Sequence, residues 1–142
     1  MDTPTDCIFC SILLGKIPAE KLYENEHVIA VLDINPIHYG HALIIPKTHC
    51  KDFLDLPDTC YHSLLQAANV VAKALVKGLN LEGFNLFSNN GTIAGQSVFH
   101  FHLHVTPRYA NDNIRFVLKL KQYSDGEMKR YGGIIRQFIQ HQ

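Results

Sequence analysis

Three histidines alternate with apolar residues in the segment Phe-His-Phe-His-Leu-His-Val at residues 99–105. Alternation with a period of two is typical of a β-strand, so His100, His102 and His104 would share one face, with successive rings about 6.7 Å apart. The apolar residues between them would be buried on the opposite face. Imidazoles on an otherwise apolar strand cost free energy unless each ring finds a partner, so the segment indicates a functional site.

Two kinds of chemistry fit this stripe of imidazoles. Three histidines can hold a catalytic metal, or one histidine can act as a nucleophile while its neighbours orient it and protonate a leaving group. The spacing alone does not choose between them. The preceding loop offers amide, hydroxyl and backbone N–H donors at Asn89, Gly91, Gly95, Gln96 and Ser97, with no carboxylate among them. Neutral donors beside imidazoles suit a phosphate better than a hard cation.

The elements that must position these residues can be predicted from the pattern of apolar and turn-forming residues. Branched and alternating apolar runs, bounded by Asn, Gly and Pro, predict five strands, at residues 21–24, 27–33, 40–46, 84–88 and 99–106. Apolar residues spaced three and four apart predict a long helix over residues 58–78, with Asp58 as its N-cap and Gly78 at its end. The result is an α+β fold with a mostly antiparallel five-stranded sheet.

Both ends of the chain are predicted to carry further helices. Residues 7–14 are apolar enough for a short helix before Gly15, and residues 126–140 have a helical pattern despite a Gly-Gly pair. The segment 114–120 could be a strand or irregular. Without a linker-like composition anywhere, residues 1–142 are predicted to form a single domain.

Composition limits the partners of the chain. The 142 residues are 46% hydrophobic and 18% charged, and 13 basic residues balance 13 acidic ones. A net charge of zero argues against nucleic acid or a membrane surface as the partner, and no segment has the length or apolarity of a membrane span or a secretory signal. We therefore expect a cytoplasmic protein with a small-molecule ligand, in which the four cysteines are thiols or metal ligands rather than disulfides.

The sequence resembles the histidine triad (HIT) nucleotide-binding family, whose signature is three histidines separated by single apolar residues and followed by two apolar positions. Residues 100–106 match this signature except at the last position, which is Thr106. The resemblance extends through several other motifs in the right order, namely Cys-Ile-Phe-Cys at 7–10, Leu-Asp-Ile at 32–34, Gly-His at 40–41, Ile-Pro-Lys-Thr-His at 45–49, Ala-Gly-Gln-Ser at 94–97 and Pro-Arg at 107–108.

This resemblance implies a homodimer, paired through the long helix and a sheet edge, that acts at the α-phosphate of a nucleotide. His102 would be the nucleophile and His104 would bind the phosphate and assist the leaving group, with His41 and Ser97 completing the catalytic set. Asn89 and Gln96 match phosphate-contacting positions and Asp33 matches the residue that binds the ribose hydroxyls, although an Asp before Ile-Asn-Pro is also an ordinary turn residue. The positions that match the base pocket are Phe9, Ile12, Ile17, Val31 and Ile34.

The nucleophile role also makes physical sense. A neutral imidazole has a reference pKa near 6.5, so His102 can be unprotonated at pH 7 if an acceptor such as a backbone carbonyl fixes its other nitrogen.

A second implication of the resemblance is a structural zinc ion. Relatives can bind zinc through two cysteines, a histidine after the third strand and the first histidine of the triad, and the matching set is Cys7, Cys10, His49 and His100. Two thiolates and two imidazoles form a closed tetrahedral set with no open catalytic position. Cys50 is a candidate substitute ligand. No organic cofactor is expected, and histidines 27, 38, 62 and 141 are predicted to be surface residues.

The leading functional hypothesis is a hydrolase of nucleoside phosphoramidates or aminoacyl-adenylates, because the stretch Gln-Ser-Val-Phe-His at 96–100 resembles the purine nucleoside phosphoramidase branch. A dinucleoside polyphosphate hydrolase of the same fold would differ mainly in the leaving group. A nucleotide-binding regulatory module without turnover and a histidine-ligated metalloenzyme are the remaining alternatives.

Overall fold

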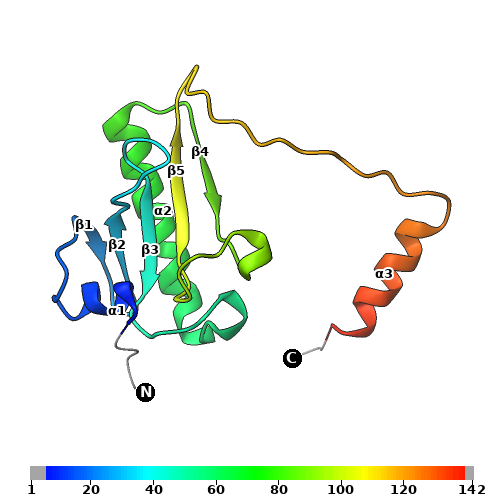
Figure 1. Cartoon of the computed structure of the whole chain (residues 1–142), viewed down its shortest axis with the longest axis horizontal. Helices are drawn as coiled ribbons and strands as arrows, with labels where there is room; N and C mark the ends of the chain where they lie inside the picture. The colour runs from blue at the N-terminus through cyan, green and yellow to red at the C-terminus, as the bar shows by residue number, and fades with distance from the viewer. Residues whose placement is uncertain (1–5, 140–142) are drawn as a thin grey trace. The chain divides into compact units, whose positions relative to one another are not determined.

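The structure is a computed structural model that describes residues 6–139 (Figure 1). It divides into two compact units, Met1–Asp112 and Asn113–Gln142. The first unit contains the sheet, the long helix and all the predicted site residues. The prediction that the whole chain forms one domain stays a prediction.

A five-stranded antiparallel sheet forms the centre of the first unit. Its strands are β1 (Lys21–Glu24), β2 (Val28–Leu32), β3 (Ala42–Pro46), β4 (Gly83–Phe87) and β5 (Leu103–Arg108), in the order β1-β2-β3-β5-β4. Each neighbouring pair is antiparallel, and β5 lies between β3 and β4. The predicted α+β class and the antiparallel five-stranded sheet are confirmed.

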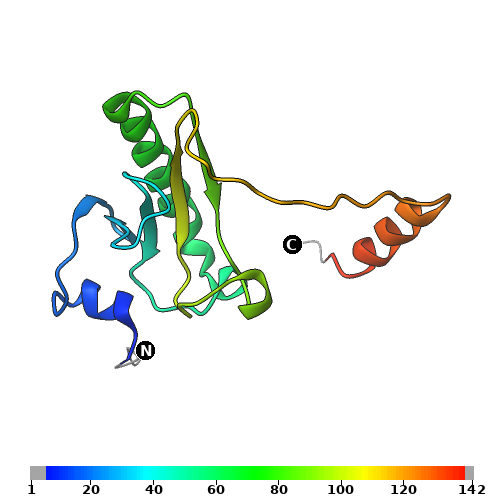
Figure 2. The ribbon, with the colours of Figure 1, turned by 45° about the horizontal axis from the view of Figure 1, so that its top comes forward.

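The two faces of the sheet are covered by different helices. Helix α2 (Tyr61–Leu79) packs on one face, where Ala30, Ile44 and Val105 meet Leu64 and other residues of its buried stripe in the main core. The short helix α1 (Ile8–Leu13) covers part of the opposite face through a second, smaller cluster. Both helices can be followed in Figures 1 and 2. The three histidines of the triad lie on the α1 face: His104 is paired with Leu43 of the smaller cluster, and Phe9 of α1 packs against His100 and His102.

The strand that carries the histidines begins later than predicted. Strand β5 starts at Leu103, so His100 and His102 precede it. The ladder between β3 and β5 ends at the pair Ile44 and Leu103, because the next groups bond elsewhere: the amide of Phe101 donates to the carbonyl of Cys50 (2.7 Å), and the carbonyl of Pro46 accepts from the His100 ring (2.9 Å). The alternation of faces persists, since Phe101 and Val105 are buried in the core under α2.

Both ends of the long helix also differ from the prediction. Asp58 begins a short 3-10 turn, η2 (Asp58–Cys60), and is not the N-cap, because α2 begins at Tyr61 with Cys60 as its cap. The helix continues past Gly78 to Leu79 and ends where Asn80 adopts a left-handed conformation (φ 53°). Asn tolerates that conformation better than most residues, so it replaces glycine as the stop signal.

The second unit contains helix α3 (Glu127–Gln137), which confirms a helix within the predicted segment 126–140 as far as the description reaches. Residues 114–120 have neither helix nor strand. Among residues 6–139, no helix combines the length and apolarity needed to cross a lipid bilayer.

Candidate functional site

A pocket of about 360 Å³ lies on the α1 face of the sheet, at the histidine strand. We call it the triad pocket. Apolar side chains from α1, from the segment that follows it and from β2 form one wall, while His102, His104, Asp33 and Ser97 supply polar groups. All five residues predicted for the base pocket line it, namely Phe9, Ile12, Ile17, Val31 and Ile34. Their arrangement is that of an apolar slot beside a polar end, which suits a nucleotide.

His102 faces this pocket with one nitrogen fixed. Its Nδ1 lies 2.8 Å from the carbonyl of His100, and because a carbonyl can only accept, Nδ1 must carry the proton. The lone pair is therefore on Nε2. The ring of Phe9 packs edge-on against the imidazole, with 4.9 Å between ring centroids, and limits its rotation. The backbone acceptor that a nucleophilic His102 requires is thus present.

His104 takes the opposite tautomer through a chain of hydrogen bonds. The backbone N–H of Ile37 donates to Nδ1 of His41 (3.0 Å), which leaves the proton of a neutral His41 on Nε2. That Nε2 lies 2.9 Å from Nδ1 of His104, which must accept, so His104 carries its proton on Nε2. The ring of Phe87 stacks on His104 at 4.6 Å and holds its plane. His102 therefore offers a lone pair where His104 offers a donor, with 4.8 Å between their ring centroids.

The rings of this site are neutral at physiological pH. Burial lowers the pKa of His41 and of His102 below the usual value of 6.5, and it lowers the pKa of His104 to about 4. For His104 the neighbouring imidazoles act in the same direction, and the charge of Asp33 acts against them. The hydrogen-bonded tautomers described above are therefore the forms present at pH 7.

The acidic and polar residues predicted for the site differ in whether their side chains already make hydrogen bonds within the protein. Asp33 lines the triad pocket, yet its Oδ1 accepts from the N–H of Asn35 (2.9 Å), so it is also the turn residue that its sequence context suggested. The Gln96 side chain is buried and occupied, because it accepts from the N–H of Gly91 and donates to two backbone carbonyls. Ser97 is exposed at the pocket wall, and Asn89 lies beside Gly95 in the same loop. The phosphate contacts of Asn89 and Gln96 stay predictions.

A second cluster brings together Cys7, Cys10, His49 and His100, whose ligand atoms all lie within 4.8 Å of one another. Nδ1 of His100 is 3.3 Å from Sγ of Cys7 and 3.1 Å from Nδ1 of His49, and Nδ1 of His49 is 3.4 Å from Sγ of Cys10. The carbonyl of Pro46 binds Nε2 of His100, so the lone pair of His100 faces the sulfurs. Two thiols and two imidazoles with one ring already oriented match the donor set that Zn²⁺ prefers. These residues could hold a metal ion.

The remaining cysteines do not join this cluster. Cys50 and Cys60 are free thiols buried in the core beneath α2, and burial raises the pKa of Cys50 to about 11. Within the described residues, the metal-ligand cluster does not include Cys50, so its role as a substitute ligand is not supported.

The structure also places the histidines that matched no motif. His62 is exposed and His27 is partly exposed, as expected of surface residues. His38 is more engaged than predicted, because its ring packs on Tyr109 with 4.3 Å between centroids. His141 lies outside the described residues. Sequence reasoning missed three contacts, because each depends on which strands become neighbours. They are the contacts of His38, the stacking of Phe87 on His104 and the hydrogen bond of the Pro46 carbonyl.

Comparison with known proteins shows which family the chain belongs to. The model of the HIT domain matches residues 15–111, which include the triad, Asp33 and His41. The chain belongs to the HIT family. Solved HIT structures agree: a HIT family protein from Bacillus anthracis is 39% identical with a TM-score of 0.90, and the match covers 97% of this chain and 100% of that one.

Two relatives are named for enzyme activities. An adenosine 5'-monophosphoramidase, HNT1 of Saccharomyces cerevisiae, is 45% identical over 72% of this chain and 62% of its own length. An adenylylsulfatase, HINT3 of Arabidopsis thaliana, is 38% identical over 84% of this chain and 60% of its own length. A Zn-bound histidine triad family protein from Mycobacterium smegmatis has a TM-score of 0.73 and 37% identity, with 93% of this HIT chain and 91% of that one covered. Cys7 and Cys10 precede the residues matched by the HIT domain model, whereas His49 and His100 lie within them.

Proposed function

We propose that the protein is a nucleotide hydrolase that cleaves the bond between the α-phosphorus of a nucleoside monophosphate group and an amine or carboxylate leaving group. The observation that carries the proposal is the pair of opposite tautomers in the triad pocket: a lone pair on Nε2 of His102 beside a proton on Nε2 of His104. A nucleophile and an acid side by side are what nucleophilic displacement with a poor leaving group requires.

The reaction would proceed in two steps. Nε2 of His102 attacks the α-phosphorus and forms a P–N bond, and the bond from phosphorus to the leaving group breaks. Nε2–H of His104 gives its proton to the departing atom, which leaves His104 an imidazolate that accepts from Nε2–H of His41 and is paired with the new positive charge on His102. In the second step a water attacks the phosphorus, gives a proton back to His104, and the bond to His102 breaks. The sum is hydrolysis, and both histidines return to their starting state. As His102 becomes positively charged in the adduct, the carbonyl of His100 that binds its Nδ1–H stabilises that charge (2.8 Å).

The substrate class is proposed from the pocket and from relatives. The apolar slot accommodates a base, Asp33 lies where it can accept from ribose hydroxyls, and one relative is named an adenosine 5'-monophosphoramidase. A dinucleoside polyphosphate would release a nucleotide that departs readily without a proton, whereas an amine needs one. The donor on His104 therefore favours nucleoside phosphoramidates over dinucleoside polyphosphates.

A panel assay tests this proposal. The protein is incubated with an adenosine phosphoramidate, a diadenosine polyphosphate and AMP, and products are separated by chromatography. We expect kcat/KM to be highest for the phosphoramidate and AMP to accumulate as product without further loss. Faster turnover of the polyphosphate would favour the alternative hydrolase, and binding without any turnover would contradict the enzyme proposal in favour of a regulatory module.

We further propose that the Cys7, Cys10, His49 and His100 cluster holds one structural zinc ion. Zinc bound there would tie α1 to the residues that lead into the triad strand, and four protein ligands leave no position for an activated water. Burial raises the pKa of the Cys10 thiol to about 12, so in the absence of a cation the cluster holds a neutral thiol. The support is the donor set together with the carbonyl of Pro46, which binds Nε2 of His100 and leaves Nδ1 for the metal.

The proposed homodimer would use the β4 edge of the sheet. β4 has a neighbour on one side only, and its Phe84 and Leu86 are 40% and 48% exposed. Leu86 is paired with Val105, whose side chain is buried under α2, so the exposed apolar residues of the edge adjoin the helix face. An unpaired edge with apolar side chains is a surface that natural proteins cover.

Light scattering tests the dimer. We expect about twice the monomer mass at micromolar concentration, and a monomer after Leu86→Glu. The matched control is Leu22→Glu on the opposite edge strand, where Leu22 is 44% exposed, and this variant should stay dimeric. A monomeric wild type would contradict the proposal.

A further inference from the structure

The loop between β2 and β3 sets the tautomer of His41 through its backbone. Besides the bond from Ile37 to the ring, the N–H of His41 donates to the carbonyl of His38 (3.0 Å), and the carbonyl of His41 accepts from the N–H of Asp33 (2.9 Å). The position of Ile37 relative to the His41 ring therefore depends on the fold of the loop. If the Ile37 N–H moved away, Nδ1 of His41 would lose the donor that keeps it unprotonated.

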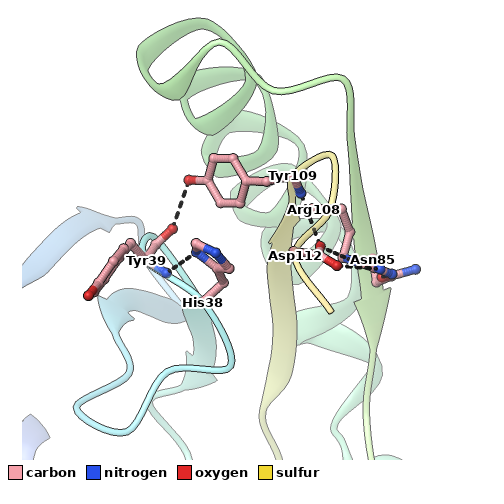
Figure 3. Close-up of polar contacts among 6 residues, drawn as sticks. All are labelled: His38, Tyr39, Asn85, Arg108, Tyr109 and Asp112. Atoms are coloured by element: carbon pink, nitrogen blue, oxygen red, sulfur yellow. Dashed lines mark hydrogen bonds and ion pairs between the residues drawn. The ribbon is translucent and has the colours of Figure 1, made fainter. Parts of the chain in front are cut away.

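Tyr109, the residue directly after β5, contacts this loop at His38 and Tyr39 (Figure 3). Its hydroxyl donates to the carbonyl of Tyr39 (3.0 Å), and its ring packs on His38 with 4.3 Å between centroids. His38 in turn accepts from the N–H of Tyr39 on its Nδ1 (2.8 Å). One side chain thus contacts two consecutive residues of the loop, directly after Ile37.

Tyr109 is itself fixed to the sheet. Its N–H donates to Oδ2 of Asp112 (3.1 Å), and the Asp112 carboxylate accepts from both Nε and Nη2 of Arg108 (2.7 and 3.1 Å). Arg108 also donates to Oδ1 of Asn85 on the neighbouring strand β4 (3.0 Å). The side chain of Asp112 is only 4% exposed, which strengthens these charged hydrogen bonds. The anchor of the loop therefore extends across two strands.

At the other end of the loop, Gly40 packs closely against α2 and β5. It has a φ of +97°, and a Cβ there would lie 2.6 Å from Leu79 and 3.1 Å from Pro107. The chain thus approaches α2 and β5 so closely at Gly40 that only glycine fits, immediately before His41. Between this fixed point and the turn at Asp33, the contacts of Tyr109 with His38 and Tyr39 add a restraint on residues 37–39 that comes from outside the loop.

We propose that Tyr109 is a positioning residue for the proposed reaction: by holding the 37–39 segment, it keeps the Ile37 N–H on Nδ1 of His41 and so keeps the proton of His104 on the nitrogen that faces the pocket. Its catalytic consequence rests on the proposed function, but its structural part does not. Tyr109 contacts no atom of the triad. It acts through the loop, His41 and His104 in that order.

The test is the tautomer of His41, read from long-range ¹H–¹⁵N correlation spectra of the imidazole rings in wild type and in Tyr109→Phe. We expect wild-type His41 to be protonated on Nε2 alone, and the variant to shift toward a mixture with protonation on Nδ1. The matched control is Tyr39→Phe, which also removes one phenol hydroxyl but keeps the backbone carbonyl that Tyr109 binds. Tyr39 is 79% exposed, so the His41 signals should match wild type.

Turnover of an adenosine phosphoramidate provides the second readout. We expect kcat to fall about three- to tenfold in Tyr109→Phe with KM unchanged, and further in Tyr109→Ala, which also removes the contact with His38. Identical His41 signals in wild type and Tyr109→Phe would overturn the inference, whatever happens to turnover. A wild type with a single His41 tautomer but no turnover of any substrate would instead refute the proposed function, and the spectra of the variants would still decide the role of Tyr109.

Discussion

The first two histidines of the triad carry the same side chain in two different tautomeric states. His100 binds a carbonyl through Nε2 and directs Nδ1 at two cysteines, whereas His102, two residues later, binds a carbonyl through Nδ1 and directs Nε2 into the triad pocket. Burial lowers the pKa of both rings. Charge therefore does not distinguish them, although His100 is fully buried and His102 is only partly buried, at the triad pocket.

The carbonyl that each ring meets makes the difference. Pro46 supplies it for His100 at the end of β3, and His100 supplies it for His102 where the chain is about to enter β5. An imidazole has one donor and one acceptor when neutral, so the partner of one nitrogen decides the chemistry of the other. In the proposed roles, His100 as a metal ligand and His102 as a nucleophile would thus stand side by side without competing for the same ion.

Removing the nucleophile should have the largest effect. His102→Ala is expected to lower kcat for an adenosine phosphoramidate by a thousandfold or more, because no other group in the pocket offers the same lone pair, while nucleotide binding changes little. Steady-state kinetics and calorimetric binding measure the two quantities. His62→Ala, which removes an exposed histidine, is the control. A loss of tenfold or less in His102→Ala would mean that His102 is not the nucleophile.

Removing the acid should have a smaller effect that depends on the substrate. His104→Ala is expected to slow substrates with alkylamine leaving groups by about a hundredfold, and substrates whose leaving group needs no proton far less. Rates are measured on wild type and variant for a series of leaving groups of graded basicity. For each protein the slope of log kcat/KM against the pKa of the leaving group is then compared. Equal deficits across the series would contradict the acid role of His104.

Disrupting the cysteine–histidine cluster around His100 should affect stability more than turnover. Cys7→Ser combined with Cys10→Ser is expected to abolish bound zinc and to lower the melting temperature on the order of 5–10 °C, because the metal would tie α1 to His100. Turnover by the folded fraction should change only modestly. Elemental analysis and calorimetry check this, with Cys50→Ala as a control that perturbs a buried thiol without touching the cluster. A wild type purified without chelators that contains no metal and is equally stable would refute the zinc proposal.

The smallest effect concerns the position where the sequence departs from the triad signature. Thr106 is 2% exposed, and its hydroxyl has no hydrogen-bond partner in the described part of the chain. Thr106→Val keeps the shape and removes an unsatisfied buried polar group, so the free energy of unfolding should rise by about 1 kcal/mol with turnover unchanged. Denaturant titration measures it, and Thr92→Val at an exposed position is the control. A loss of stability in Thr106→Val would indicate a partner for the hydroxyl.

The sequence predicted the sheet well where local pattern decides. The alternation of His and apolar residues placed the imidazoles on one face, and the apolar runs located all five strands to within a few residues. It failed where tertiary contacts decide. The start of β5 depends on Pro46 and Cys50 offering their carbonyls to other partners, and the end of α2 depends on Asn80 taking a conformation that glycine usually takes.

The same limit applied to the site. That His102 needs an acceptor could be predicted, but the chain from Ile37 through His41 to His104 could not, because it joins a loop to a strand more than sixty residues away.

The central claim is that Nε2 of His102 forms a covalent bond to the nucleotide, and trapping the adduct tests it most directly. Wild type is mixed with an adenosine phosphoramidate, quenched in alkaline denaturant within one turnover, digested and analysed by mass spectrometry. We predict a peptide that contains His102 with the mass of one added nucleotidyl group, formed and lost at rates that account for kcat and absent from His102→Ala. Product release with no adduct at any quench time, or an adduct on another residue, would contradict the account.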